Sequence, residues 1–257
     1  MLVATMNQND YSLLNKMNIQ TDIIVGNQCA INKVEEFKYR GNNVRWYSFS
    51  EKGVGLNRNN ALMRAKGDYL IFADDDMVFV NGYDQIVKEA FAKNPKADVI
   101  IFNLLEENPG NRSQIAKVHY TNKIGYGAAR IACRRRVIHE RGIFFNLCFG
   151  GGTEHYRGED TLFLAECVKK NLNILCMPLY IAQLTYERPS TWFCGYDDKY
   201  FVDTGVLMAA AGLRFRRIRL LKNAFAMSRN KQGGGRKFSE ILKLLDRGVK
   251  EYRSKGR

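Results

Sequence analysis

Three consecutive aspartates, Asp74, Asp75 and Asp76, follow the short apolar run Tyr-Leu-Ile-Phe at residues 69–72. Such a run is typical of a strand covered on both faces, and in open α/β sheets ligands bind at the carboxyl ends of the strands. Adjacent carboxylates repel one another, so we expect a bound cation to neutralise them. Asp74 and Asp76 would point to one side of an extended strand and Asp75 to the other. A solvated turn is the alternative interpretation.

A second acidic pair, Glu159 and Asp160, stands at the predicted start of a helix, after the glycine-rich residues 150–158. The composition of residues 150–158 predicts a mobile polar loop. A carboxylate beside such a loop could reach a substrate hydroxyl and act as a general base. The alternative is an ordinary acidic first turn, which the helix dipole favours. His155 could ligate a metal or contact an acceptor, but a histidine satisfied within the loop is the simpler interpretation.

Repeated strand and helix patterns must position these acidic residues. The first half of the chain predicts strands at residues 2–4, 22–25, 44–49, 69–72 and 98–104, and helices at 13–17, 34–37, 61–65 and 80–93. The second half predicts strands at 113–120, 128–133 and 174–177, the last one stopped by Pro178, and helices at 134–141 and 162–168. Alternation of this kind predicts a mainly parallel sheet with helices on both faces.

Positive charge is concentrated at the C-terminal end of the chain. Of a formal net charge of +14, residues 201–257 contribute +11, with 15 Lys/Arg against 4 Asp/Glu. This asymmetry predicts a polyanionic partner: a membrane, a nucleic acid or another protein. In an amphipathic interfacial element, Phe215, Ile218, Leu220 and Leu221 would enter an anionic lipid surface. A solvated helix packed on the body of the protein is the alternative.

Cysteine usage and hydropathy indicate a cytosolic protein. The six cysteines form no Cys-x-x-Cys pair, so the sequence does not indicate a zinc site, and we expect free thiols. The N-terminal residues do not resemble a secretory signal, and no stretch of about 20 apolar residues is present to span a membrane.

Four short motifs, in this order, resemble those of the inverting family 2 glycosyltransferases, and the resemblance covers residues 2–178. The motifs are Ala4-Thr5-Met6-Asn7, Leu56-Asn57-Arg58-Asn59-Asn60-Ala61, Ile71-Phe72-Ala73-Asp74-Asp75-Asp76 and Gly158-Glu159-Asp160. The family typically has Pro-x-Tyr-Asn, Ala-Arg-Asn-x-Gly, Asp-x-Asp and an acidic pair that includes the catalytic base at these places. One departure is Asn27-Gln28-Cys29-Ala30, where the family typically has Asp-Asp-Gly-Ser. An asparagine amide can still bond a uracil edge.

The resemblance implies an α/β GT-A fold, a Rossmann-like mixed and mainly parallel sheet flanked by helices. The catalytic domain would span residues 1–189, with a donor half at 1–104 and an acceptor half at 105–189, and a helical basic extension would follow at 190–257. Asp74 and Asp76 would hold Mn²⁺ or Mg²⁺, and Asp160, with Glu159 beside it, would be the catalytic base. The nucleotide would contact Thr5, Asn7, Asn27, Arg58 and Asp75. For Arg58, a surface salt bridge is nearly as good an interpretation.

The implied function is transfer of a sugar from a nucleotide sugar, with UDP as the expected nucleotide, to a hydroxyl of a growing glycan. A lipid-linked bacterial surface polysaccharide at the cytoplasmic face of the inner membrane is the expected setting, and no nucleic-acid partner is expected. A sugar nucleotidyltransferase is an alternative, but residues 6–11 lack a phosphate loop rich in glycine and lysine. A basic RNA-binding module is a second alternative, but the basic tail has few aromatic residues to stack on bases.

Overall fold

The computed structural model describes residues 1–106, 110–119, 126–185, 195–212 and 216–255. The strands are β1 (Leu2–Met6), β2 (Ile23–Gln28), β3 (Lys33–Tyr39), β4 (Asn42–Phe49), β5 (Tyr69–Asp74), β6 (Met77–Phe79), β7 (Val99–Leu104), β8 (Ala116–Lys117), β9 (Ile131–Arg134) and β10 (Ile174–Leu184). The helices are α1 (Ser12–Lys16), α2 (Val54–Arg64), α3 (Tyr83–Lys93), α4 (Arg135–Glu140), α5 (Glu159–Lys169), α6 (Asp198–Ala210), α7 (Arg216–Ser228) and α8 (Phe238–Ser254). Short 3₁₀ turns lie at Ala128–Arg130 and Lys231–Gly233.

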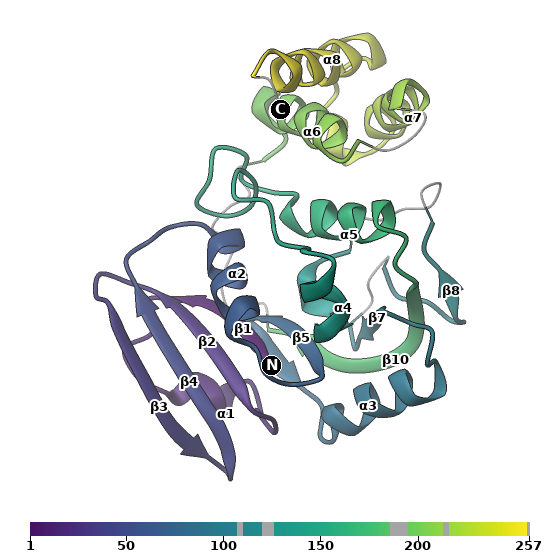
Figure 1. The fold of residues 1–257 in the computed structure, drawn as a ribbon. Coiled ribbons are helices and arrows are strands. Elements are labelled where there is room, and N and C mark those ends of the chain that lie inside the picture. Colours follow the sequence, from purple (N-terminus) through teal and green to yellow (C-terminus); the bar gives the residue numbers. More distant parts are fainter. Residues whose placement is uncertain (107–109, 120–125, 186–194, 213–215, 256–257) are drawn as a thin grey trace.

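The strands form one sheet in the order β3-β4-β2-β1-β5-β9-β7-β10-β6, with β8 paired to β10 (Figure 1). Strands β4, β2, β1 and β5 run parallel, and so do β7 and β10, while β9 is antiparallel to both of its neighbours. The predicted mixed, mainly parallel α/β sheet is confirmed. The carboxyl ends of β1, β2 and β5 consequently meet at one edge, which is where the aspartates lie.

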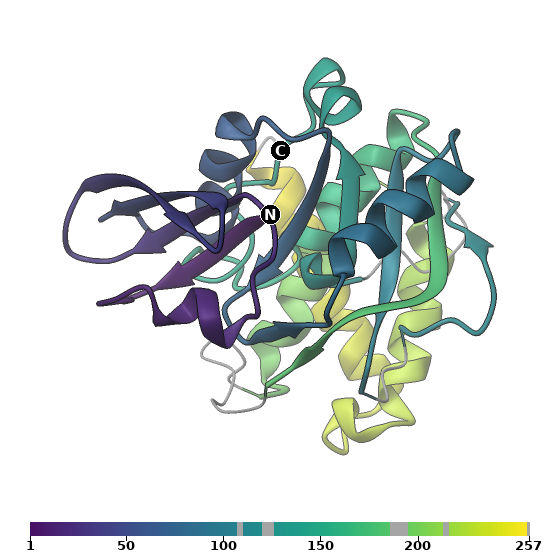
Figure 2. The same ribbon diagram turned by 90° about the horizontal axis from the view of Figure 1, so that it is seen from below.

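Apolar side chains of the central strands fill both sides of the sheet. In β5, Leu70 and Phe72 join the core cluster beneath α2, α4 and α5, whereas Ile71 and Ala73 join the cluster beneath α1 and α3. This division explains why the run reads as continuously apolar, and Figure 2 shows helices on both sides of the sheet.

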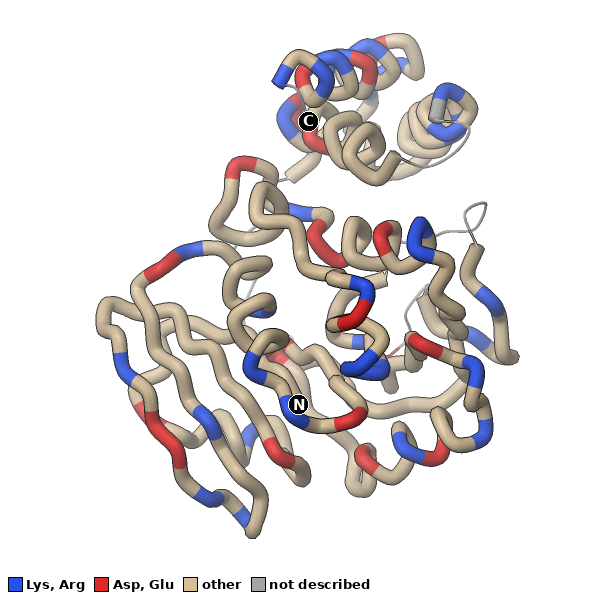
Figure 3. The backbone as a smooth tube through the Cα atoms, viewed as in Figure 1, with Lys and Arg blue, Asp and Glu red and all other residues tan. Residues whose placement is uncertain are grey.

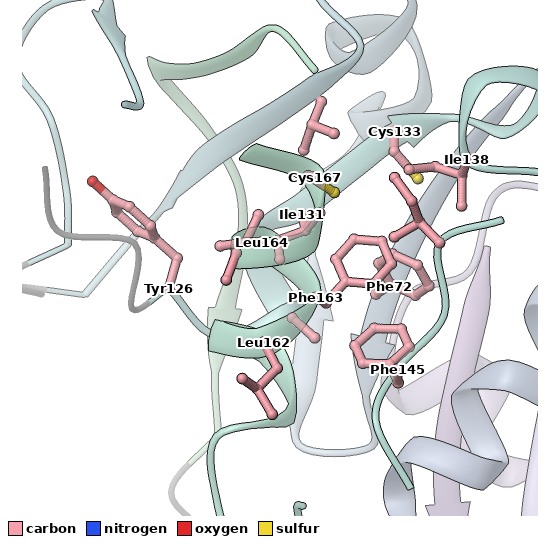
Figure 4. Close-up of a cluster of buried hydrophobic side chains, with 14 of the residues drawn as sticks. Phe72, Tyr126, Ile131, Cys133, Ile138, Phe145, Leu162, Phe163, Leu164 and Cys167 are labelled. Carbon is pink, nitrogen blue, oxygen red and sulfur yellow. The ribbon is translucent and has the colours of Figure 1, made fainter. Parts of the chain in front are cut away.

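An aromatic contact seats helix α5 on strand β5 (Figure 4). The Phe163 ring lies 5.4 Å from the Phe72 ring and 4.5 Å from the Phe145 ring, measured between centroids. Such pairs contribute about 0.5–1.5 kcal/mol beyond the burial of their area. The first residues of α5 are thereby brought towards the end of β5, which carries the aspartates.

Some elements differ from the sequence expectations. Residues 34–37, predicted as a short helix, belong to β3, an edge strand antiparallel to β4, and Phe37 packs on Tyr11 with ring centroids 4.5 Å apart. Strand β6 was missed, and α3 begins only at Tyr83. Of the predicted strand at 113–120, residues 113–119 are described, and among these only Ala116–Lys117 is a strand. Part of 128–133 is a 3₁₀ turn.

The sequence predicts that the last strand stops at Pro178, and this prediction is wrong. Strand β10 continues through it to Leu184. Its pairing with β8 ends at Cys176, and its pairing with β6 begins at Ala182, so the proline lies between two partner segments. Register shifts against β7 on either side of Tyr180 accommodate the irregularity.

Helices α6, α7 and α8 form a cluster beyond α5, and many of the Lys and Arg residues of the chain lie on it (Figures 1 and 3). Leu220, Ala224 and Met227 of α7 are buried in the core that these helices share. The expectation that Leu220 enters lipid is therefore wrong, and Phe215 lies outside the described residues. None of the helices in the described part of the chain is both long and apolar enough to cross a bilayer.

Two glycines allow α6 and α8 to touch backbone to backbone. A Cβ on Gly205 would lie 2.0 Å from the Leu245 carbonyl oxygen, and a Cβ on Gly248 would lie 2.0 Å from that of Val202. No side chain fits at either distance. The crossing therefore requires both glycines, although glycine is unfavourable inside a helix by roughly 0.5–1 kcal/mol.

We expect Gly248→Ala to lower the free energy of unfolding by about 1–3 kcal/mol, the usual cost of overpacking. In a helix without this contact the same change would stabilise. Urea denaturation followed by circular dichroism measures the difference. Gly67→Ala is the matched control, because its Cβ would meet the Tyr69 oxygen at an ordinary 3.4 Å. A Gly248→Ala protein as stable as the wild type would contradict the close crossing.

Candidate active site

Arg58 of helix α2 contacts carboxylates of both acidic groups. Its Nη2 lies 2.6 Å from Asp74 Oδ1, and its Nη1 lies 2.9 Å from Glu159 Oε1 and 2.8 Å from Asp160 Oδ1. The Arg58 side chain is 4% exposed, whereas those of Asp74 and Asp160 are 37% and 21% exposed. A buried guanidinium thus unites the two acidic groups in one site, and the carboxylates on either side of it remain open to approach.

Two asparagines beside Arg58 fix helix α2 in place. Asn57 Nδ2 donates to the Gly26 carbonyl at 2.8 Å, and a Cβ on Gly26 would lie 1.8 Å from Asn57 Oδ1. The amide of Asn59 pairs with the main chain of Phe145 in both directions, at 2.9 and 2.8 Å. Asn57 therefore ties the helix to the sheet, and Asn59 ties it to the segment after α4. The base of the Arg58 side chain is held from both sides.

At the end of β1, Thr5 and Asp75 are joined. Thr5 Oγ1 donates to Asp75 Oδ2 at 2.6 Å and accepts from Gln8 Nε2 at 2.9 Å. Asp75 thus reaches towards β1, and its carboxylate lies among groups of the first strand end. Asn7, which follows β1, adopts a left-handed conformation with φ 52°. Asparagine tolerates that region better than most residues do.

Asn27, near the end of β2, is buried, with only 1% of its surface exposed to solvent. Its Oδ1 accepts from Gln8 N and its Nδ2 donates to Gln8 O, both at 3.0 Å. The amide therefore holds the main chain that follows β1. A carboxylate could accept from Gln8 but could not donate to it, which gives a structural reason for asparagine at this position.

Asp76 lies outside strand β5. The strand ends at Asp74, and Asp75 and Asp76 form the turn into β6. We expected Asp74 and Asp76 to point to one side of an extended strand. That expectation is wrong, because the chain is no longer extended at Asp76. The turn arises because β6 folds back along β10, antiparallel to it.

The donor atoms at this turn suit a hard cation. Asp74 is partly exposed and Asp76 is exposed, and carboxylate oxygens are preferred ligands of Mg²⁺ and Mn²⁺. Within the described residues, no group of three or more His, Cys, Asp or Glu side chains is arranged to hold a metal by itself. A cation on Asp74 and Asp76 would complete its shell with water and phosphate oxygens, as Mg²⁺ commonly does.

The proton affinity of the Asp160 carboxylate is raised. Burial raises its pKa to about 7, Arg58 opposes that shift, and Glu159 and Asp74 add to it. Burial disfavours the charged guanidinium of Arg58, but the three carboxylates outweigh burial and raise its pKa above the ordinary value. Arg58 therefore stays charged, and Asp160 can take up and release a proton near neutral pH.

Backbone hydrogen bonds hold residues 148–158 in a compact loop, while the mobility that their composition predicts stays a prediction. Gly150 N donates to the His155 carbonyl at 2.8 Å, and the Gly151 carbonyl accepts from Val54 N at 2.9 Å. The second bond fastens the loop to the first residue of helix α2. The segment that leads into Glu159 is therefore built against the helix that carries Arg58.

His155 links this loop to the C-terminal helices. Its Nδ1 lies 2.9 Å from Asp203 Oδ1, and both residues are 3% exposed. Burial opposes ionisation of Asp203, but hydrogen bonds from His155 and Lys199 lower its pKa below the usual value. This geometry agrees with the simpler interpretation of His155 as a satisfied loop histidine.

The roles of Asn57, Asn59 and Gln8 were not predicted from the sequence, although one signal for the asparagines was present. Consecutive residues of a helix point about 100° apart, so Asn57, Arg58 and Asn59 cannot all lie on one solvent face. In a helix packed against a sheet, some of them must be buried and bonded. Gln8 carried no such signal.

Comparison with known proteins places the chain in a family. The model of glycosyl transferase family 2 matches residues 11–148, which include Arg58 and the three aspartates but end before Glu159. No curated protein sequence matches the chain.

Solved structures with a similar fold include S. aureus TarS. The crystal structure of TarS 1–349 in complex with UDP-GlcNAc has a TM-score of 0.58 and 16% identity, over 81% of this chain and 65% of that one. The crystal structure of TarS has a TM-score of 0.59 and 16% identity, over 89% of this chain and 42% of that one. The chain thus spans less than two thirds of either TarS chain. Since the family model covers more than half of its residues, this chain belongs to glycosyl transferase family 2.

Proposed function

We propose that the protein is a metal-dependent inverting glycosyltransferase that moves a sugar from a UDP-sugar to a hydroxyl of a growing glycan. One observation carries the proposal: Arg58 holds Asp74 of the donor half 2.6 Å from one nitrogen and Asp160 of the acceptor half 2.8 Å from the other. A donor at the sheet edge and an acceptor hydroxyl at Asp160 would then meet at the same place. The family membership supports this reaction class.

The acceptor hydroxyl must lose its proton as it attacks the anomeric carbon. Asp160, when ionised, takes that proton, and the partly exposed side chain gives the hydroxyl access to it. Attack on the face opposite the leaving diphosphate inverts the anomeric configuration. Glu159 accepts from Arg58 at 2.9 Å and so contributes to holding the guanidinium beside the base.

The leaving diphosphate must be stabilised as its bond to the sugar breaks. Asp74 and Asp76 would hold Mn²⁺ or Mg²⁺, which supplies positive charge for the diphosphate oxygens. The nucleotide is proposed to lie near the end of β1. Its proposed contacts are Thr5, Asn7 and Asp75, together with Asn27 and Arg58 next to them. The crystal structures of TarS 1–349 include complexes with UDP-GlcNAc and with UDP, which supports UDP as the nucleotide here.

The test is a thermal-shift panel of nucleotide sugars with Mn²⁺. A ligand at about 100 times its Kd stabilises the native state by about 2.7 kcal/mol, so a bound UDP-sugar should raise Tm visibly. Asp76→Ala should remove the metal-dependent part of the shift, and Asp84→Ala, an acid on helix α3, is the control. Salt-sensitive RNA binding without any response to nucleotide sugars would overturn the proposal in favour of an RNA-binding module.

The rate of transfer is expected to rise with pH and then to level off above about pH 7. The base must be ionised, and burial raises the pKa of Asp160 to about 7. Below that value the rate should fall about tenfold per pH unit as Asp160 becomes protonated. A kcat profile at saturating UDP-sugar measures this. A rate that stays constant from about pH 5.5 to 8 would contradict the assignment of Asp160.

We also propose that helix α7 lies on an anionic membrane at the cytoplasmic face, near a lipid-linked acceptor. Ile218, Leu221 and Phe225 are 52%, 47% and 52% exposed and fall at i, i+3 and i+7, along one side of the helix. The helix contains no acidic residue, and Arg217 and Lys222 are exposed beside these apolar side chains. An apolar face flanked by basic side chains is typical of interfacial helices.

The double variant Leu221→Ser/Phe225→Ser is expected to bind anionic vesicles at least about tenfold more weakly, because two apolar side chains no longer enter the lipid. Flotation with vesicles containing phosphatidylglycerol measures the change, and vesicles of phosphatidylcholine alone test the charge requirement. Phe238→Ser is the control, since Phe238 is an exposed aromatic residue on α8. Equal flotation of wild type and double variant would exclude this surface.

A further inference from the structure

The guanidinium of Arg58 contacts acidic residues of both halves of the site. Nη2 bonds Asp74, and Nη1 is shared between Glu159 and Asp160. One positive charge therefore faces three carboxylates, so none of them is fully compensated. A ligand that moves the guanidinium towards Asp74, or away from it, therefore changes the positive charge that Glu159 and Asp160 experience.

The guanidinium has little freedom to leave this position. The side chain is 4% exposed, and its Cζ lies 5.4 Å from the centre of the Phe145 ring. Asn57 and Asn59 hold the helix on either side, as described above. A response to a ligand at Asp74 must therefore be a redistribution of its hydrogen bonds within the site, since a swing into solvent would leave a buried, packed position.

We propose that Arg58 is a positioning residue that couples donor binding to the catalytic base. A cation held at Asp74 would compete with Arg58 for the Oδ1 that the guanidinium now binds, and the guanidinium would then bear more fully on Glu159 and Asp160. The base would be fixed in place when the donor is present. This inference rests on the proposed function, and it adds a residue whose action is communication between donor and acceptor rather than contact with the reacting atoms.

Coupling of this kind is reciprocal, so it can be measured without turnover. If the donor changes the affinity for an acceptor at Asp160, the acceptor must change the affinity for the donor by the same factor. Asp160→Asn alters the acceptor side of this pair and so probes the path through Arg58. Typical couplings between sites correspond to changes of about 5-fold to 150-fold in affinity. A direct effect of the Asp160 charge on the donor would act whether or not Arg58 is present, so the two explanations can be separated.

A double-mutant cycle tests the coupling, with UDP and Mn²⁺ as the probe in isothermal titration at about pH 8, where Asp160 is ionised. We expect Asp160→Asn to change the Kd for UDP at least about fivefold in the wild-type background and less than about twofold in Arg58→Lys. Lysine keeps the charge but lacks the two-armed fork. Arg58→Gln serves as a second background, and Tm values establish that each protein is folded.

Glu166→Gln is the matched control, because it removes one charge from the same helix at a carboxylate that pairs with Lys169 and Lys170 instead. It should leave the Kd for UDP unchanged. An equal effect of Asp160→Asn in every background would overturn the coupling while leaving the proposed function intact. Failure of the wild type to bind UDP would instead overturn the proposed function, and the coupling with it.

Discussion

Replacing Asp160 with asparagine is expected to lower the rate of sugar transfer by about 10²–10⁴-fold while UDP still binds. A positioned general base contributes about that factor, and asparagine has nearly the same shape but cannot take up a proton. Arg58 can still donate to the amide oxygen of asparagine, so the contact at Nη1 can persist. At saturating donor the loss should appear in kcat, since the donor contacts at β1 and β5 do not depend on this proton transfer. The change in donor affinity expected through Arg58 is seen separately, in the Kd for UDP.

The measurement is release of UDP in the presence of an acceptor glycan, with binding of UDP followed separately. Glu166→Gln on the same helix should leave kcat within about twofold, because it is a surface change away from the site. Transfer by Asp160→Asn at a rate near that of the wild type would exclude Asp160 as the base. Loss of both binding and transfer would indicate instead that the substitution disturbs the whole site.

Local sequence patterns predicted the fold class and the two acidic groups. The run at residues 69–72 is apolar on both faces because β5 lies in the middle of the sheet, and that burial is visible in composition alone. The position of the aspartates at its end followed from the same pattern. Element order, strand by strand, was enough to predict a mainly parallel sheet.

Contacts between distant segments could not be predicted in the same way. Arg58 bonds Asp160 across 102 positions of sequence, and no local periodicity specifies such a pair. Strand β3 looked helical because Val34 and Phe37 are three residues apart, whereas pairing with β4 decided its conformation. The loop at 148–158 is predicted to be mobile because it is rich in glycine, but composition could not predict that a Cβ on Gly150 would lie 2.6 Å from Val54 Cγ1. Glycine there permits close packing.

The three-carboxylate site also explains why the base must be tuned by its neighbours. A lone exposed aspartate has a pKa near 4 and would be a weak acceptor of an alcohol proton. Burial raises that value towards 7 for Asp160, and Arg58 limits the increase so that the residue still ionises near neutral pH. The same guanidinium thus serves stability and proton transfer, and its removal should affect both.

Arg58→Met is expected to lower the free energy of unfolding by about 3–5 kcal/mol at neutral pH, which is the usual cost of removing one partner from a buried ion pair. Methionine approximates the aliphatic part of arginine, so the loss reports mainly the charge. Arg64→Met on the same helix is the control, because Arg64 is exposed and donates to the neighbouring Asn60 carbonyl. A surface change of this kind should cost less than about 0.5 kcal/mol.

The destabilisation by Arg58→Met should also depend on pH, with a definite sign. Arg58 opposes the rise in the pKa of Asp160 that burial and the charges of Glu159 and Asp74 cause. Without Arg58 the pKa of Asp160 therefore lies further above its unfolded value, and the folded state binds more protons than the unfolded state. Stability then falls as pH rises from about 4, the unfolded pKa of an aspartate, through the raised folded pKa of Asp160. Urea denaturation at about pH 5 and pH 8 should show the larger deficit at pH 8. A deficit independent of pH would mean that Arg58 stabilises through packing on Phe145 rather than through its charge.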